Sequence, residues 1–217
     1  WRLMRSKQLQ PWVGLPNILC GEFVVNSALT PAVSGSAAGG YITYDGSCPG
    51  GTHGILNRAG GGTRLSVTGT TDRDYIWIKD LTFTGASTAD NVFVTSSATD
   101  HWKFTGNTFR DSTNSRRGIR WQGGDTYIGY NTFVNITANG IYTTGAPRGV
   151  IEHNTMTNVG LPGVGSNTDV IAVDDGSPNT IVRFNNIVGV RGTDSAGIDV
   201  QDDTTVGAGT DLVYGNF

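Results

Sequence analysis

Asp-Thr-Tyr-Ile-Gly-Tyr-Asn-Thr-Phe at residues 125–133 and Arg-Gly-Val-Ile-Glu-His-Asn-Thr-Met at residues 148–156 are two copies of one pattern. In each copy, residues that favour β-structure lead to an asparagine, a threonine and an apolar residue. The pattern recurs along the chain, with its asparagines at Asn107, Asn131, Asn154, Asn185 and Asn216. The steps between these asparagines are 24, 23, 31 and 31 residues. A short repeat that tolerates insertions is typical of a solenoid.

A second repeated pattern lies between the copies of the first. Gly-Ile-Arg-Trp at 118–121, Gly-Ile-Tyr-Thr at 140–143 and Gly-Ile-Asp-Val at 197–200 align on their isoleucines, as does Val-Ile-Ala-Val at 170–173. Each coil therefore holds at least two short strands joined by glycine- and serine-rich turns. We predict an all-β, single-stranded parallel β-helix of about seven or eight coils. Residues 1–40 are expected to supply an N-terminal cap and the first strands, and residues 41–217 one continuous domain.

Composition excludes several classes of partner. The formal net charge of −3 gives no general attraction to nucleic acid or to an acidic membrane surface. No apolar run reaches the roughly 18 residues that suggest a membrane-spanning helix. Glycine accounts for 32 of 217 residues, which suits a fold with many turns. We therefore expect neither nucleic acid nor a membrane as a partner.

The two cysteines, Cys20 and Cys48, are 28 residues apart, which is close to one coil. Residues one coil apart are stacked neighbours about 5 Å from each other, near the distance of a disulfide. We predict a disulfide, and the alternative is a pair of free buried thiols. A disulfide would indicate an oxidising compartment, extracellular or periplasmic.

The recurring asparagines have a structural explanation. An asparagine amide can donate to the carbonyl of an identical side chain one coil away, so that stacked copies form a ladder. Such a ladder satisfies polar groups that would each cost about 1–3 kcal/mol if they were buried without a partner. The apolar residues of the same pattern should stack as a core column, namely Phe83, Phe109, Phe133, Met156 and Ile187.

The two patterns together, written Gly-Ile-x-Val and Val-x-Ile-x-x-Asn-Thr-Phe, resemble those of the right-handed parallel β-helix repeat proteins, the superfamily of pectate lyases and polygalacturonases. The resemblance covers about residues 41–217. It implies the right-handed fold and, for most members, action on acidic polysaccharides outside the cell or in the periplasm. Other members of the group are phage tailspikes, adhesins or surface proteins that catalyse nothing.

Outward positions of the second strand should line up along the solenoid axis. Alignment on the isoleucines places Arg120, Tyr142, Ala172 and Asp199 in one column, with Asp174, Asp175 and Asp202 close by. Arg116 and Arg117 come from an earlier coil on the same side. Acidic and basic groups side by side on a long face suit an anionic sugar chain, with Trp121 and Tyr142 as surfaces for sugar stacking. On adjacent coils, Glu152 and Arg183 are expected to form an ordinary exposed ion pair.

Lyases of the superfamily use a Ca²⁺ ion held by carboxylates and a basic residue that removes the proton next to the uronate carboxylate. The resemblance therefore implies a possible Ca²⁺ held by Asp174, Asp175, Asp199 and Asp202, because calcium prefers oxygen ligands. It also implies Arg120 or Arg148 as the catalytic base, and Arg116, Arg117, Tyr142 and Trp121 as substrate-binding residues. Alternatively, the paired aspartates are polar turns at strand ends.

Asn-Thr-Asp at residues 167–169, before an apolar strand, resembles a motif of polygalacturonases in which the aspartate is the general acid. This makes Asp169 a candidate, with Asp194 as the second carboxylate that inverting hydrolysis requires. The chain departs from the family here, because Thr-Asp-Ser-Ala at 193–196 replaces the expected Gly-Asp-Asp and no His-Gly or Arg-Ile-Lys follows.

Three functions remain open at this point. We expect a polysaccharide lyase acting on a uronate-containing glycan. The alternatives are a non-catalytic glycan-binding or surface-spike β-helix, and a polygalacturonase-like hydrolase. The repeat is still running at Asn216 and Phe217, so that oligomerisation through an uncapped coil is also possible.

Overall fold

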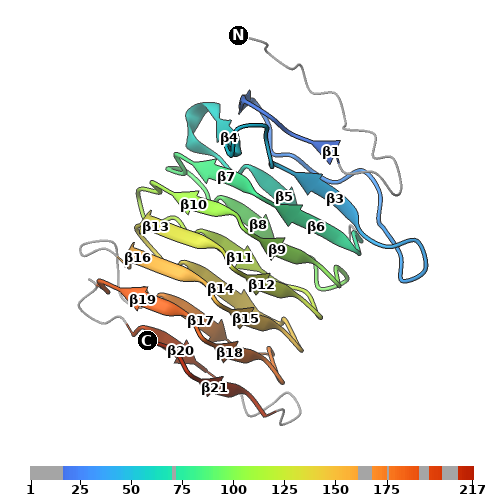
Figure 1. Cartoon of the computed structure of the whole chain (residues 1–217). Helices are drawn as coiled ribbons and strands as arrows, with labels where there is room; N and C mark the ends of the chain where they lie inside the picture. Colours follow the sequence, from blue (N-terminus) through green and yellow to red (C-terminus); the bar gives the residue numbers. More distant parts are fainter. Residues whose placement is uncertain (1–16, 70–71, 161–167, 175, 191–195, 202–209) are drawn as a thin grey trace.

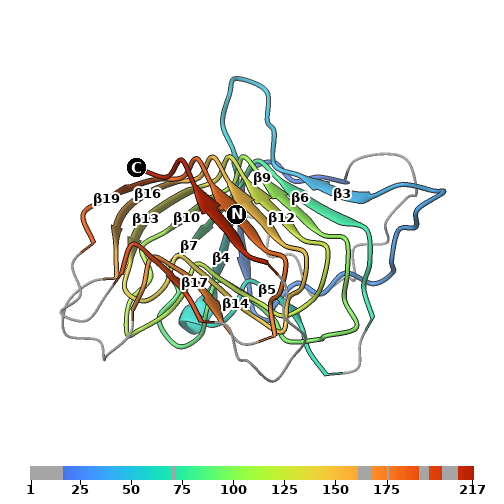
Figure 2. The same cartoon turned by 90° about the horizontal axis from the view of Figure 1, so that it is seen from below.

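The computed structural model describes residues 17–69, 72–160, 168–174, 176–190, 196–201 and 210–217. These residues form three parallel β-sheets that run along a solenoid (Figure 1). Seen along the axis, the sheets form the three sides of a prism around the core (Figure 2). Within the described residues the structure is all-β apart from the single 3-10 turn η1 (Ala59–Gly61), so no helix there could cross a bilayer.

Each complete turn of the solenoid contributes one strand to each sheet. Sheet A contains β1 (Asn17–Ile18), β3 (Ile42–Asp45), β6 (Ile76–Lys79), β9 (Lys103–Thr105), β12 (Tyr127–Gly129), β15 (Val150–Glu152), β18 (Ile181–Arg183) and β21 (Leu212–Tyr214). Sheet B contains β2 (Glu22–Val25), β4 (Gly54–Arg58), β7 (Leu81–Thr84), β10 (Thr108–Arg110), β13 (Thr132–Ile136), β16 (Thr155–Val159) and β19 (Asn186–Val188). Sheet C contains β5 (Leu65–Val67), β8 (Val92–Val94), β11 (Ile119–Trp121), β14 (Ile141–Thr144), β17 (Ile171–Asp174) and β20 (Ile198–Val200).

The number of complete turns is about six, since sheet C has six strands. The prediction of seven or eight coils was therefore slightly too high. The physical reason lies in the first coil, where Leu29 makes only an isolated bridge to Leu65 and no full strand of sheet C precedes β5. Sequence periodicity counted this irregular coil as a regular one.

The apolar column of the first pattern is confirmed. Phe83, Phe109 and Phe133 stack on sheet B with ring centroids 4.9 and 4.8 Å apart, and all three side chains are buried. The strand register continues the column through Met156 and Ile187. Identical rings at strand spacing fill the interior without voids, which stabilises the solenoid by burying apolar surface.

The asparagine ladder is also confirmed. It follows the turn from sheet A to sheet B, where Nδ2 of Asn107, Asn131, Asn154 and Asn185 each donates to Oδ1 of the next asparagine along the axis over 2.9–3.0 Å. The last acceptor is Asn216. At the other end, where Leu81 replaces the asparagine, Asn107 Oδ1 accepts the Leu81 backbone N–H instead. The ladder thus satisfies the buried amides at every bend.

The first coil is tied to the next by the predicted disulfide. Cys20 and Cys48 are bonded, and their Cα atoms are 5.5 Å apart. The alternative of two free thiols is thereby excluded. Residues 1–16 of the expected cap region, 1–40, lie outside the described residues, so the cap stays a prediction. Oligomerisation through the last coil likewise stays a prediction.

Candidate functional site

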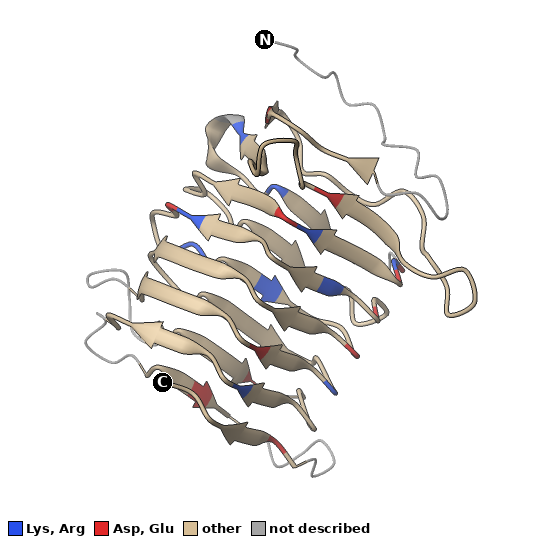
Figure 3. Ribbon diagram, viewed as in Figure 1, with Lys and Arg blue, Asp and Glu red and all other residues tan. Residues whose placement is uncertain are grey.

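The outer surface of sheet C carries the column that the isoleucine alignment predicted. Phe93, Arg120, Tyr142, Ala172 and Asp199 occupy matched positions on β8, β11, β14, β17 and β20. Each of these residues is the central residue of its aligned tripeptide, and its two neighbours in the strand point toward the core. The period of two along a strand therefore directs the central side chains away from the core, and of the five only Ala172 is buried. Charged residues are otherwise spread along the solenoid, and most of the ribbon carries none (Figure 3).

We call Arg116, Arg117 and Arg120, with the rings of Phe93 and Tyr142, the arginine face. The Arg120 guanidinium lies 5.2 Å from the Phe93 ring centroid and 5.8 Å from that of Tyr142. The Arg117 guanidinium lies 4.6 Å from the Tyr142 centroid. Two cations therefore flank one aromatic ring, an arrangement in which the guanidinium planes stay available to an anion.

The three arginines differ in how they are held. Arg117 is oriented by Asn139, whose Oδ1 accepts from Nε at 3.0 Å, and by Asp90, 3.7 Å from Nη1. Arg120 forms no ion pair with any described residue, and its buried Nε has no hydrogen-bond partner among them. The Nε of Arg116 is unpartnered in the same way. Arg116 and Arg120 thus offer positive charge that no carboxylate among the described residues neutralises, whereas Arg117 is paired with Asp90.

Tyr142 is linked to the next coil through Asp174. Burial raises the pKa of Tyr142, and a hydrogen bond from its hydroxyl to the Asp174 carboxylate raises it further, while Arg117 and Arg120 act in the opposite direction. The phenol therefore stays protonated at neutral pH. It can donate a proton but is a poor base.

The structure describes two of the four residues that were expected to hold Ca²⁺. Asp174 and Asp199 lie on neighbouring strands of sheet C, but Asp174 is bonded to Tyr142 and Asp199 accepts from Gln201 Nε2 at 2.6 Å. Asp175 and Asp202 lie outside the described residues. Calcium takes six to eight oxygens. The described residues supply two of the four expected carboxylates, so the calcium site stays a prediction.

Asp169 is buried at the corner between sheets B and C, with 6% of its surface exposed. Its Oδ1 accepts the Ala196 backbone N–H at 2.7 Å, so it joins two coils. A general acid must reach its substrate, and this carboxylate faces the protein instead. Asp194, its proposed partner, lies outside the described residues.

Trp121 is a core residue, which corrects the expectation that it offers a sugar-stacking surface. Its side chain is fully buried, its ring lies 5.3 Å from that of Trp102, and its indole N–H donates to the Gly123 carbonyl at 2.7 Å. The alternation along β11 sends Arg120 outward and Trp121 inward. The two neighbours therefore cannot both contact a ligand.

Arg148 lies apart from the arginine face, at the turn between sheets C and A. Its Nε and Nη2 donate to Oδ1 and Oδ2 of Asp125 at 2.8 and 2.6 Å, and this carboxylate raises the pKa of Arg148. A guanidinium held protonated by a bidentate carboxylate is a poor candidate for a catalytic base.

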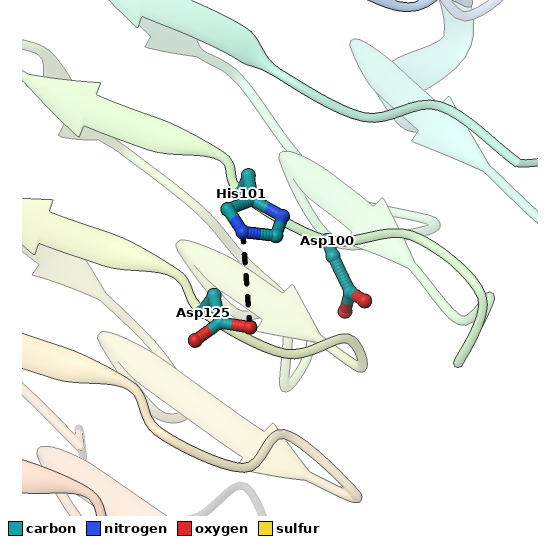
Figure 4. Close-up of side chains that lie close together, drawn as sticks. All are labelled: Asp100, His101 and Asp125. Carbon is teal, nitrogen blue, oxygen red and sulfur yellow. Dashed lines mark ion pairs between the residues drawn. The ribbon is translucent and has the colours of Figure 1, made fainter. Parts of the chain in front are cut away.

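The same turn gathers a group that sequence reasoning missed. Asp100, His101 and Asp125 approach one another there, with His101 Nε2 4.0 Å from Asp125 Oδ2 (Figure 4). We call these three residues the His101 corner. The signal was present, since residues 101, 125, 148 and 179 each stand six positions before a ladder asparagine. All four have positive φ, so that their side chains project from equivalent turns.

Glu152 and Arg183 are not the exposed pair that was expected. Glu152 is 7% exposed, and its carboxylate accepts from Tyr127 at 2.8 Å and from Arg183 at 2.6 Å. Arg183 donates in turn to the Tyr214 hydroxyl. Burial acts to raise the pKa of Glu152, but the two hydrogen bonds outweigh it and the pKa is lowered. The Tyr127 ring covers Gly129, the residue that pairs with Glu152 in sheet A, so the carboxylate of the pair is buried while Arg183 stays partly exposed.

Comparison with known proteins agrees with this architecture. A family model described as the right handed beta helix region matches residues 90–211. The chain belongs to this right-handed β-helix family. The solved structure of an alginate lyase from a Paenibacillus species matches 99% of this chain and 70% of its own, with a TM-score of 0.69 and 22% identity. At that identity the likeness concerns the fold alone.

A much shorter likeness involves a different class of protein. Two lipid-A-disaccharide synthases, from Albidiferax ferrireducens and Verminephrobacter eiseniae, are 62% and 65% identical to this chain over 37 residues. The matched stretch is 17% of this chain and 10% of each synthase, so the chain spans about a tenth of the length of these relatives. The matched stretch is therefore much shorter than the β-helix.

Proposed function

We propose that this protein is carbohydrate-active, that it binds a uronate-containing polysaccharide along the arginine face, and that it cleaves the chain by β-elimination. The observation that carries the proposal is the Arg120 guanidinium, which lies between two aromatic rings and has no anionic partner among the described residues. A planar carboxylate is the natural partner of a guanidinium, and the rings of Phe93 and Tyr142 suit the apolar face of a sugar.

The chemistry of such a lyase begins with the substrate carboxylate. Arg117 and Arg120 would neutralise it, and this makes the neighbouring C–H proton easier to remove. The base takes that proton, the C–H electrons form the new double bond, and the glycosidic C–O bond breaks. Tyr142, whose hydroxyl stays protonated at neutral pH, would return a proton to the departing oxygen.

The base is the least supported role. Arg120 is the candidate that the family resemblance implies, but a guanidinium normally remains protonated. Carboxylate recognition is therefore the role that the chemistry of Arg120 supports best. The Ca²⁺ that the resemblance implies would be held by Asp174, Asp175, Asp199 and Asp202 and would supply further charge neutralisation, and no step is assigned to it.

The disulfide between Cys20 and Cys48 supports an oxidising location, and we propose that the protein works in the extracellular space or the periplasm. The alginate lyase with a similar fold supports a polysaccharide as the partner.

The test is to incubate the protein with alginate and polygalacturonate, and with neutral dextran as a control polymer. Elimination creates a conjugated double bond, so ultraviolet absorbance should rise with a uronate polymer only. Arg120→Ala should abolish the signal, whereas Arg110→Ala should not, because Arg110 is an exposed residue of β10 beside Asp111. Cleavage of neither uronate polymer would contradict the lyase proposal.

A non-catalytic glycan-binding module is the second candidate. One observation favours it: among the described residues, the arginine face contains no histidine or lysine to act as a base. Retention of wild-type protein on a uronate polymer in affinity electrophoresis, without product formation, would support binding alone. A polygalacturonase-like hydrolase is less favoured, because Asp169 faces the protein.

A further inference from the structure

The His101 corner combines donors from two successive coils. Asp100 and His101 precede β9, and Asp125 precedes β12 one coil later (Figure 4). One imidazole nitrogen and two carboxylate oxygens lie within 4.8 Å of one another. It is the one such group of three found among the described residues.

The spacing fits ligands of a shared ion better than it fits a hydrogen bond. His101 Nε2 faces Asp125 Oδ2 at 4.0 Å, which is too long for a hydrogen bond. Two atoms bound to one ion at about 2.0–2.2 Å can lie up to about 4.4 Å apart. Contraction of the group by a few tenths of an ångström would therefore bring all three donors to an ion.

Both carboxylates are held in place by bonds that leave lone pairs free. Asp100 Oδ1 accepts the Gly124 backbone N–H at 2.6 Å, and Asp125 accepts both bonds from Arg148. A carboxylate has about four lone-pair sites, so each can accept these bonds and still bind an ion. Metal-binding carboxylates are commonly fixed by outer hydrogen bonds of this kind.

Two more observations mark the corner as a prepared site. The His101 Nδ1 atom is buried and has no hydrogen-bond partner among the described residues, so the ring is held by stacking on Tyr75, with centroids 4.4 Å apart. Gly124 lets Asp100 and Arg148 approach the backbone closely, because a Cβ there would lie 2.8 Å from Asp100 Oδ1 and 3.1 Å from Arg148 Nη2.

We propose that Asp100, His101 and Asp125 bind one divalent transition-metal ion of the zinc or manganese class. The imidazole distinguishes this site from a calcium site, since calcium takes oxygen ligands. With three protein ligands the ion keeps open positions for water or a ligand carboxylate. The bound ion links two coils at the turn between sheets C and A. The site is separate from the arginine face and does not depend on lyase activity.

The test uses the full chain without an affinity tag. After treatment with a chelator, the protein is dialysed against Zn²⁺, Mn²⁺ or Ca²⁺ at equal concentration, and bound metal is measured by mass spectrometry and by calorimetry. Wild type should bind one zinc or manganese ion per chain and prefer either to calcium, and the bound ion should raise Tm.

His153 provides a matched control. It has positive φ, as His101 does, and stacks on Tyr130 with centroids 4.9 Å apart, but among the described residues it belongs to no group of metal donors. His153→Ala should bind metal as wild type does, while His101→Ala should lose it. Asp100→Ala provides a second loss-of-binding variant, and circular dichroism checks that each variant is folded.

The proposal is overturned if wild type takes up no stoichiometric zinc or manganese, if calcium binds more tightly than both, or if His101→Ala binds as wild type does. Loss of the ion in His153→Ala would also overturn the assignment. These measurements involve no polysaccharide. Failure of the lyase proposal would therefore not affect the metal-site proposal, and failure of the metal-site proposal would not affect the lyase proposal.

Discussion

Asn131 donates from Nδ2 to Oδ1 of Asn154 over 3.0 Å, and its own Oδ1 accepts from Asn107 at the same distance. Each amide of the ladder thus serves two neighbours, one on either side along the axis. This pairing explains why one polar residue type recurs at an inward bend that is closed to water.

Removal of one ladder amide should destabilise the whole solenoid. Asn131→Ala removes the oxygen that accepts from Nδ2 and the backbone N–H of Asn107, and it removes one of the two donors to Asn154 Oδ1. Each buried group left unsatisfied costs about 1–3 kcal/mol. The free energy of unfolding, measured with urea, should fall by about 2–5 kcal/mol. Asn135→Gly is the control, because Asn135 lies exposed on β13 with a positive φ that glycine adopts without strain, and its effect should stay within about 0.5 kcal/mol. Similar losses for the two variants would contradict the role of the ladder.

A cavity in the phenylalanine column should greatly lower the free energy of unfolding. Phe109→Ala removes the fully buried middle ring between Phe83 and Phe133, which should cost about 3–5 kcal/mol. Phe109→Leu should cost less, since it retains most of the volume. Tyr130→Ala, at a ring that is 58% exposed, serves as the comparison in the same urea experiment. An equal loss at Tyr130 would be inconsistent with a core column.

Reduction of the disulfide should release the first coil. The bond closes a loop of sequence separation 28, for which chain entropy predicts about 3–4 kcal/mol of stabilisation. Wild type should lose stability in a reducing buffer, while a variant with both Cys20→Ser and Cys48→Ser should be insensitive to the reductant. The measurement is thermal unfolding of both proteins with and without the reductant. Equal sensitivity of the two proteins would show that the reductant acts elsewhere.

Glu152 should make stability depend on pH in the acid range. Its pKa in the folded protein is lower than the ordinary value of 4.5, so folding favours the ionised form. The resulting stabilisation is present above that ordinary value and is lost as the pH falls through the lower folded-state pKa.

The matching variant is Glu152→Gln, which cannot ionise. At neutral pH it should be less stable than wild type by about 1–3 kcal/mol, because Arg183 then faces a neutral amide. The difference between the two proteins should shrink as the buffer is taken to about pH 3. A difference that stays constant over this range would mean that Glu152 is not ionised in the folded protein.

Tyr142→Phe separates binding from cleavage on the arginine face. The ring remains for Arg117 and Arg120, so affinity for a uronate polymer should change little. The lost hydroxyl should lower the rate of elimination by about 100-fold or more if it protonates the departing oxygen. Binding and initial rates on one polymer give the comparison. An unchanged rate would remove Tyr142 from the chemistry.

The sequence alone determined the fold, because a β-helix places the same residue type at the same bend in every coil. The asparagine and isoleucine spacings therefore predicted the ladder, the core column, the parallel register and the outward column that holds Arg120 and Tyr142. They also predicted the bond between Cys20 and Cys48. Only the coil count was slightly off, since Leu29 pairs without forming a full strand.

Tertiary structure decided which side chains reach solvent and which turns meet. Trp121 points into the core because its neighbour Arg120 points out, and Glu152 is covered by the Tyr127 ring from the preceding coil. The His101 corner depends on left-handed turn geometry that directs side chains of two coils toward one point. Strand periodicity carries no information about that direction, since it ends where the turn begins.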